Sequence, residues 1–476
     1  MMRRGLLLLL LATAGCSMAP KYVRPQPPVP MSWPVGDAYL RQSEATLPSV
    51  SYRDVFRDAR LQRLIETALA NNRDIRIAAA NIATARAQYR IQRAQIFPQV
   101  GAGSSYNRAR TSGSGTGTGG GFARPGGTFS ADVGISGFEI DLFGRLRSLS
   151  EAELNRYFAS EAAARATRLT LVGDIADAWL AYAADRSLLQ VAQDTVASAR
   201  RSVELTRARL AGGIAPRTDL AQSQQILGQA EADVALQTTA IAQDVNALRL
   251  LVGADFDEAL LADSIAAAGP TVAPLPAGLD STILLRRPDI VQAEYQLRAA
   301  NAEIGAARAA LFPTISLTSV IGFASTALTS LFTGDALAWS VTPSIGYPIF
   351  RAGAGRAQVQ LSEAQRDAAV ANYERAIQTG FRDVADALAR RGTLAAQLAA
   401  IDAQAAAAAD TFRLTEARYR GGIDPFLSSL DAQRSLYVAQ RSQVTVRLVA
   451  ASNGVTLYRV LGGDALVASG AAPERP

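Results

Sequence analysis

The sequence predicts a mainly α-helical protein with a small antiparallel β portion, built from two tandem copies of one unit. Three observations predict this fold class. Long stretches of residues recur at a constant offset, the apolar spacing changes from helical to alternating and back within each copy, and each copy holds a run of more than 60 residues without proline. Each copy should therefore contain long helices and one β-hairpin.

The repeat can be aligned over several segments. Residues 74–98 match residues 289–313 at an offset of 215, and residues 205–214 match 414–423 at an offset of 209. We assign 57–254 to the first repeat and 281–463 to the second. A linker at 255–280 joins them, and a C-terminal tail follows at 464–476.

Both repeats begin with a helix that ends at a β-hairpin. Apolar side chains recur every seven residues from Ile75 to Ile96 and from Ile290 to Leu311, which is typical of a helix packed on another helix. Proline then ends each helix, and alternating apolar residues predict hairpins at 97–143 and 312–350. The alternation changes phase near Gly137, which indicates a β-bulge.

The second half of each repeat predicts a helical hairpin. Helices are expected at 144–211 and 356–420, and at 1.5 Å per residue each is about 100 Å long. Paired glycines at 212–213 and 421–422 end them. Helices with a seven-residue apolar repeat follow at 214–253 and 423–461, so each pair of glycines marks the tip of a helical hairpin.

The amino terminus predicts export. Two arginines precede six leucines at 6–11, and small residues lead to Cys16, the single cysteine of the chain. We interpret 1–15 as a signal peptide. The residues before Cys16 resemble the lipobox of bacterial lipoproteins, which implies lipidation (palmitate) at Cys16, followed by an extended segment at 16–56. Ser17 after the cysteine implies sorting to the outer membrane. The alternative is ordinary signal cleavage that leaves an exported thiol.

Composition argues against an enzyme. The chain has no histidine and one cysteine, so histidine-based catalysis and multi-thiolate metal sites are excluded, and we expect neither a metal nor a cofactor. The glycines at 115, 117 and 120 lie in a hairpin loop and not before a helix, which argues against dinucleotide binding. The formal net charge is +6, but the arginines are scattered among acidic residues, so nucleic-acid binding is not expected.

The membrane signal is confined to the hairpins. No stretch after residue 16 holds the ~18 uninterrupted apolar residues of a membrane-spanning helix. A chain that crosses the membrane would therefore do so as a β-barrel. Four strands are too few to close one, because small transmembrane barrels start near eight strands, so the strands would have to be shared between protomers.

Several segments together resemble one family. The tips 209–213 and 418–422, the opening 19–25 and the phrases 139–145 and 284–290 are similar to the TolC/OprM outer membrane efflux family, in its NodT-like lipoprotein branch. The resemblance implies a homotrimer, with a trimeric 12-stranded antiparallel β-barrel from four strands per protomer and an α-barrel of long coiled-coil helices. It also implies the outer membrane exit duct of a tripartite efflux pump, with a periplasmic adaptor and an inner-membrane RND-type pump as partners.

The same resemblance assigns two sets of residues at the tips. Those expected to dock the adaptor are Arg209, Gly212, Gly213, Arg418, Gly421 and Gly422. Those expected to form the iris that constricts the pore are Thr218, Asp219, Tyr419, Asp424, Ser428 and Asp431. The alternative is purely structural: the glycines only end helices, and the aspartates are solvated helix caps.

Two other functions stay open at this point. One is the outer membrane duct of a type I secretion system, and the other is a periplasmic coiled-coil lipoprotein without a pore. The identity of the substrate and of the cognate pump and adaptor cannot be read from the sequence.

The iris assignment leads to a first prediction. Three-fold symmetry would bring copies of Asp431 into a ring that holds or filters the pore. We expect Asp431→Ala to raise single-channel conductance in planar bilayers and to increase leakage of large antibiotics. Conductance equal to that of the unmodified protein would contradict the role of Asp431.

Overall fold

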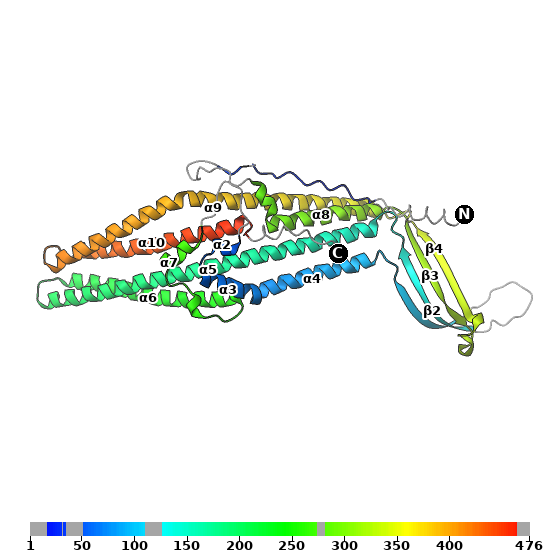
Figure 1. The fold of residues 1–476 in the computed structure, drawn as a ribbon, viewed down its shortest axis with the longest axis horizontal. Helices are drawn as coiled ribbons and strands as arrows, with labels where there is room; N and C mark the ends of the chain where they lie inside the picture. Colours follow the sequence, from blue (N-terminus) through cyan, green and yellow to red (C-terminus); the bar gives the residue numbers. More distant parts are fainter. Residues whose placement is uncertain (1–16, 31, 35–50, 110–125, 274–280, 464–476) are drawn as a thin grey trace, which may run out of the picture. The chain divides into compact units, whose positions relative to one another are not determined.

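The computed structural model describes residues 17–30, 32–34, 51–109, 126–273 and 281–463. Cys16, the predicted signal peptide, the glycine-rich loop and the predicted C-terminal tail lie outside these residues. The main elements in chain order are α2 (Tyr52–Val55), α3 (Ala59–Asn71), α4 (Arg73–Ala94), β1 (Val100–Ala109), β2 (Gly126–Glu139), α5 (Arg145–Ala211), α6 (Arg217–Val252), α7 (Ile265–Ala268), α8 (Pro288–Ala309), β3 (Thr314–Ser325), β4 (Leu337–Gly346), α9 (Ala354–Arg420) and α10 (Phe426–Val460) (Figure 1).

The predicted fold class is confirmed. Long helices dominate, and the described residues form four strands, two from each repeat. α5 and α9 contain 67 residues each. None of the helices in the described ranges is both long enough and apolar enough to span a membrane.

The chain forms two compact units that do not coincide with the two repeats. One unit combines 82–160 and 293–373 with the N-terminal segment up to Pro25, and it contains all four strands. The other combines 26–81, 161–292 and 374–476, and it contains the tips of both helical hairpins. Each unit thus takes segments from both repeats, and each is described by itself below.

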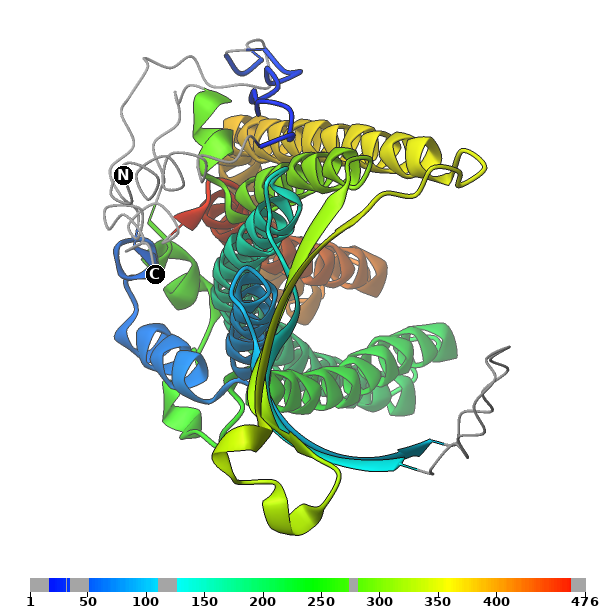
Figure 2. The same ribbon diagram turned by 90° about the vertical axis from the view of Figure 1, so that its right-hand side faces the viewer.

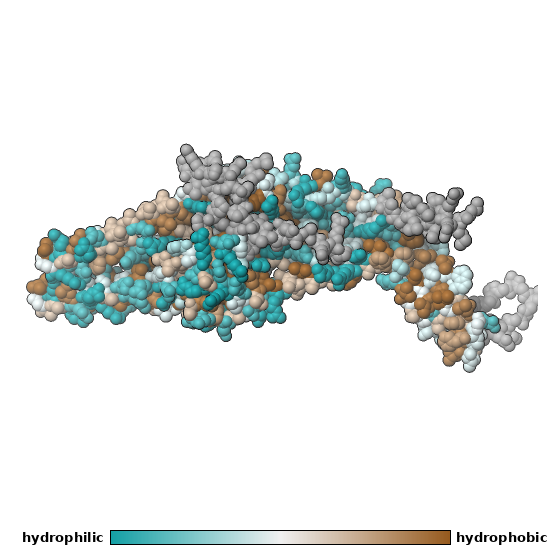
Figure 3. All heavy atoms as spheres, viewed as in Figure 1, coloured by the Kyte–Doolittle hydropathy of each residue, from teal (hydrophilic) through white to brown (hydrophobic). Residues whose placement is uncertain are grey.

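In the first unit the strands form one antiparallel sheet in the order β1-β2-β3-β4. Figure 2 shows that the strands bend together into a curved sheet. One face is apolar: Val133, Ile321 and Trp339 share a row across the sheet and are 47%, 57% and 73% exposed. The neighbouring row on the other face holds the small or polar residues 132, 322 and 338. Apolar residues accordingly gather over the strands in Figure 3.

The predicted bulge in β2 is confirmed. The register with β3 shifts between Ile135 and Phe138, and Gly137 has a φ of +61°, a conformation that favours glycine. The Gly137 N–H donates to Thr318 Oγ1 at 3.1 Å. The extra residue returns Phe138 to the apolar face, opposite Leu317.

Also in the first unit, the N-terminal segment is bound along α8. Glu294 is nearly buried and accepts hydrogen bonds from both Arg24 (2.6 and 3.0 Å) and Arg298 (2.6 Å). Farther along α8, Asn301 donates to the carbonyl oxygen of Pro20, and the backbone of Ala19 lies where a side chain at Gly305 would be. The segment therefore runs antiparallel to α8 and reaches its last turns.

The core of the second unit surrounds the middle of α5. Trp179 is fully buried, and its indole N–H donates to the Leu260 carbonyl at 3.0 Å. Phe56 packs edge-on against Tyr458 of α10, with ring centroids 5.3 Å apart. Arg459, the next residue of α10, pairs with Asp174 and Asp177 of α5. The ion pairs of Arg459 join α10 of the second repeat to α5 of the first.

Candidate functional site

The two helical hairpins of the second unit end in the same turn. At the first tip, Gly213 has a φ of +73°, and Ile214 N–H donates to the carbonyl of Arg209, five residues earlier. At the second tip, Gly422 has a φ of +74°, and Ile423 donates to Arg418. This is the Schellman arrangement, in which a left-handed glycine satisfies the last carbonyls of a helix. All four predicted tip glycines are exposed.

Arg209 joins the two tips. Its guanidinium donates to the carbonyl oxygens of Tyr419 (3.0 Å) and Arg420 (3.3 Å), at the C-terminal end of α9. It also lies over the Tyr419 ring, 4.3 Å from the centroid. A cation at this position gives the carbonyls at the helix C-terminus an additional donor and interacts favourably with the helix dipole and with the aromatic ring.

Tyr419, predicted as an iris residue, is buried in the single chain. It is 5% exposed and belongs to an apolar cluster with Ala199, Ile226, Phe426 and Leu430. Its ring lies 5.3 Å from that of Phe426. Burial raises the pKa of its hydroxyl. Within the chain, Tyr419 therefore packs the hairpins together and supports Arg209.

Arg418 occupies the place in the second repeat that Arg209 occupies in the first, but it has a different partner. It forms a two-point ion pair with Asp424 of its own hairpin, at 2.7 and 2.9 Å. The guanidinium lowers the pKa of the Asp424 carboxyl. Arg418 is exposed, so this pair stiffens the second turn without joining it to the first.

The other predicted iris residues lie near the starts of α6 and α10. Thr218 and Asp431 are exposed, whereas Asp219 and Ser428 are half-buried. Burial raises the pKa of Asp219. In the part of the chain that the structure describes, no hydrogen bond joins Thr218 or Asp431 to the other candidates, and no three carboxylate or thiol groups are placed to hold a metal ion.

Sequence reasoning missed a polar contact between α6 and α10. Tyr437 donates its hydroxyl proton to Asp233, and Gln229 and Arg441 also contact that carboxylate. Asp233 is 7% exposed, at a core position of α6. The sequence does contain one sign of this contact, because Asp233 lies at helical spacing from residues 226 and 230, which are buried.

A second carboxylate contact lies between α5 and α6. The carboxyl groups of Asp185 and Asp244 lie close enough to interact. The Tyr182 hydroxyl of α5 lies near Asp244, and Arg186 and the acidic residues 258 and 263 lie around that hydroxyl. Burial, and then the neighbouring Asp185 carboxylate, raise the pKa of Asp244 to about 6. Burial also raises the pKa of Asp185. Two such carboxyls share one proton more readily than they carry two charges.

Comparison with known proteins identifies the family. The model of the family described as "Outer membrane efflux protein" matches the chain twice, at residues 64–254 and 279–463, and these matches overlap most of the two repeats assigned above. The chain belongs to the outer membrane efflux protein family. This family is one of transport ducts rather than enzymes.

Individual relatives match over almost their whole length. The antibiotic efflux pump outer membrane protein ArpC and the toluene efflux pump outer membrane protein TtgC, both of Pseudomonas putida, are each 43% identical over 451 residues, 94% of this chain and 93% of theirs. The open-state outer membrane channel MtrE of Neisseria gonorrhoeae superimposes with a TM-score of 0.82 at 33% identity, over 94% of this chain and 98% of that one.

The two tip arginines provide a matched prediction for this family member. Arg209→Gln removes two hydrogen bonds and the contact with the Tyr419 ring, so we expect the tips to separate more easily, by about 1–2 kcal/mol. Amide hydrogen exchange across 414–430 should accelerate about tenfold or more. Arg418→Gln loses only an exposed ion pair and should change exchange little. Equal acceleration in the two variants would refute the specific role of Arg209.

The carboxylate pair predicts a pH dependence. Because the folded-state pKa of Asp244 is raised, its stabilising effect is complete below pH ~4 and is lost as the pH rises through about 6. At pH 7.5, Asp244→Asn should therefore raise the free energy of unfolding by about 1 kcal/mol, a small value because the carboxyl is partly solvated. The variant should accordingly melt at a higher temperature than the unmodified protein at pH 7.5 and at the same temperature at pH 4.5. Asp194→Asn, at an exposed position on α5, is the control. A pH-independent difference would contradict the prediction.

Proposed function

We propose that three copies of the chain form the outer membrane exit duct of a tripartite efflux pump, through which small toxic organic compounds leave the cell passively. The observation that carries this proposal is the two-faced sheet of the first unit. Its apolar face suits lipid and its small, polar face suits water. β1 and β4 lie at the ends of the strand order, so each offers an edge to another strand. Three such sheets would supply the 3 × 4 = 12 strands of a closed barrel.

The helices support the same assembly. α4 buries none of its side chains, although Ile75, Ile82 and Tyr89 repeat every seven residues. The corresponding seam of α8 is buried within the chain at Ile290 and Leu297. The seam of α4 is only half-buried within the chain, so part of it is left for a neighbouring copy. The reach of α5 and α9, about 100 Å each, suits an α-barrel that extends into the periplasm.

The tips are the proposed contact with the periplasmic adaptor, and the inner-membrane pump would deliver substrate through it. Ile214 and Ile423 follow the glycine turns and are 78% and 66% exposed, and Leu427 is 55% exposed. Exposed apolar residues beside backbone turns are suited to protein docking. The proposed iris set remains Thr218, Asp219, Tyr419, Asp424, Ser428 and Asp431, with Tyr419 acting through the packing of α9 against α5.

A lipid at Cys16 is the proposed membrane anchor. Ala19 lies against Gly305 near the C-terminal end of α8, and β3 begins at Thr314. Three residues of extended chain reach at most ~11 Å. Lipidation at Cys16 would thus place the acyl chains close to the sheet, where both would enter the same membrane.

The substrates are proposed as a class from the relatives, which are named for antibiotic and toluene efflux. Wide ducts select little, so the pump would determine which compound leaves. The type I secretion duct and the coiled-coil lipoprotein without a pore are the alternatives that the experiment below separates from this proposal.

The test uses the purified full chain in planar bilayers. We expect a trimer with stable single-channel current. Trp339→Arg, on the apolar face of β4, should reduce insertion because an arginine on the lipid-facing side of a strand costs up to about 2–4 kcal/mol, depending on its depth in the bilayer. Ser340→Arg, the next residue on the opposite face, is the matched control and should insert normally.

Two outcomes would favour the alternatives. Folded trimers without current would favour the lipoprotein without a pore. In a duct-deficient strain, restoration of protein secretion rather than of solvent or drug tolerance would favour the secretion duct.

A further inference from the structure

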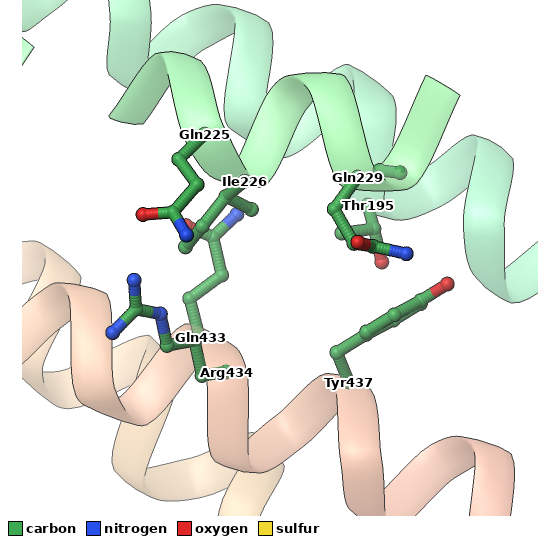
Figure 4. A pocket seen from close by; sticks show the side chains of 8 residues that line it. Thr195, Gln225, Ile226, Gln229, Gln433, Arg434 and Tyr437 are labelled. Atoms are coloured by element: carbon green, nitrogen blue, oxygen red, sulfur yellow. The ribbon is translucent and has the colours of Figure 1, made fainter. Parts of the chain in front are cut away.

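A small cavity lies near the tips of the second unit, between the helical hairpins of the two repeats. Its volume is about 150 Å³, and its walls come from α5, α6 and α10 (Figure 4). A cavity of about this size holds a single benzene ring in a well-studied engineered protein. The space is therefore large enough for one aromatic ring and too small for a drug-sized molecule.

One part of the cavity is apolar. Ile226 and Ala230, on successive turns of α6, are 9% and 1% exposed. The Tyr437 ring extends from α10 and lies across from Gln229 in Figure 4. The polar groups beside that ring are already paired, because Tyr437 and Gln229 both donate to Asp233. An occupant would therefore place its ring against Ile226 and Tyr437 and would gain no hydrogen bond there.

The other part of the cavity is polar and unpaired. Arg434 of α10 and Gln225 of α6 come from opposite walls, and their polar ends point toward one another in Figure 4. Among the described residues, neither side chain has a hydrogen-bond or ion-pair partner. No carboxylate lines the cavity. A guanidinium beside an amide donor matches a carboxylate, which accepts two parallel hydrogen bonds from arginine.

We propose that this cavity binds a monocyclic aromatic carboxylate of the size of benzoate, with its ring between Ile226 and Tyr437 and its carboxylate on Arg434 and Gln225. The bound molecule contacts α6 of the first repeat and α10 of the second, so it stabilises the packing of the two hairpins. The proposal rests on that packing within one chain and is independent of the proposed duct.

The test is titration of the full-length protein in detergent with benzoate, followed by ligand-observed NMR and by melting temperature. We expect saturable binding in the millimolar range, as for a ligand with so few atoms, and a higher melting temperature. Benzamide, which is neutral, should bind about tenfold more weakly. Arg434→Gln should weaken benzoate binding about tenfold while benzamide binding stays the same. Ala230→Phe fills the cavity and should abolish binding of both.

Arg413→Gln is the matched control, because it removes an exposed arginine of α9 that pairs with Asp410 outside the cavity. It should leave benzoate binding unchanged. The proposal is overturned by the absence of saturable benzoate binding, by equal affinities for benzoate and benzamide, or by an Arg413→Gln effect as large as that of Arg434→Gln. Because Ala230→Phe retains every charge, its result separates loss of the cavity from a general change in electrostatics.

Discussion

The fold depends on a sheet that a single chain leaves incomplete. One face of the four strands presents Val133, Ile321 and Trp339 to the surroundings, and the strand order ends at β1 and β4. The helices of the same unit leave these three side chains 47–73% exposed, and α5 and α8 pack against each other at Ala152, Ala299 and Ala302. Along α4, the half-buried residues Ile75, Ile82 and Tyr89 form a further apolar surface that the chain covers only in part. The assembly proposed above would cover these surfaces.

The two repeats share a backbone design and differ in their side-chain contacts. Both tips use the same glycine turn, and both long helices contain 67 residues. Arg209 nevertheless reaches across to Tyr419, whereas Arg418 turns back to Asp424. Duplication therefore preserved the geometry of the hairpins, while of the two equivalent tip arginines only Arg209 reaches the other hairpin.

Most of the fold could be predicted from the sequence because its signals are periodic. Seven-residue spacing predicted the helices, alternation predicted the strands, and a change of phase at Gly137 predicted the bulge, which is confirmed. The pairing of side chains was not predictable, since it depends on which faces of distant helices meet. Arg209 was assigned to a docking surface, and only the structure places it on the carbonyls of α9. Asp233 and Tyr437 were missed because a polar residue at a core position acquires meaning only from its partner.

The identical turns at the two tips have a consequence for recognition. Each turn presents exposed backbone of glycine and one isoleucine, with little side-chain information that distinguishes the first repeat from the second. A partner that binds the exposed backbone of these turns would find two equivalent binding sites on each chain. A three-fold assembly would present six such turns. A ring of six identical partner subunits could bind them one each, and a ring of three partner subunits could bind them two each. The different contacts of Arg209 and Arg418 would then be the feature that distinguishes the tip of the first repeat from the tip of the second for such a partner.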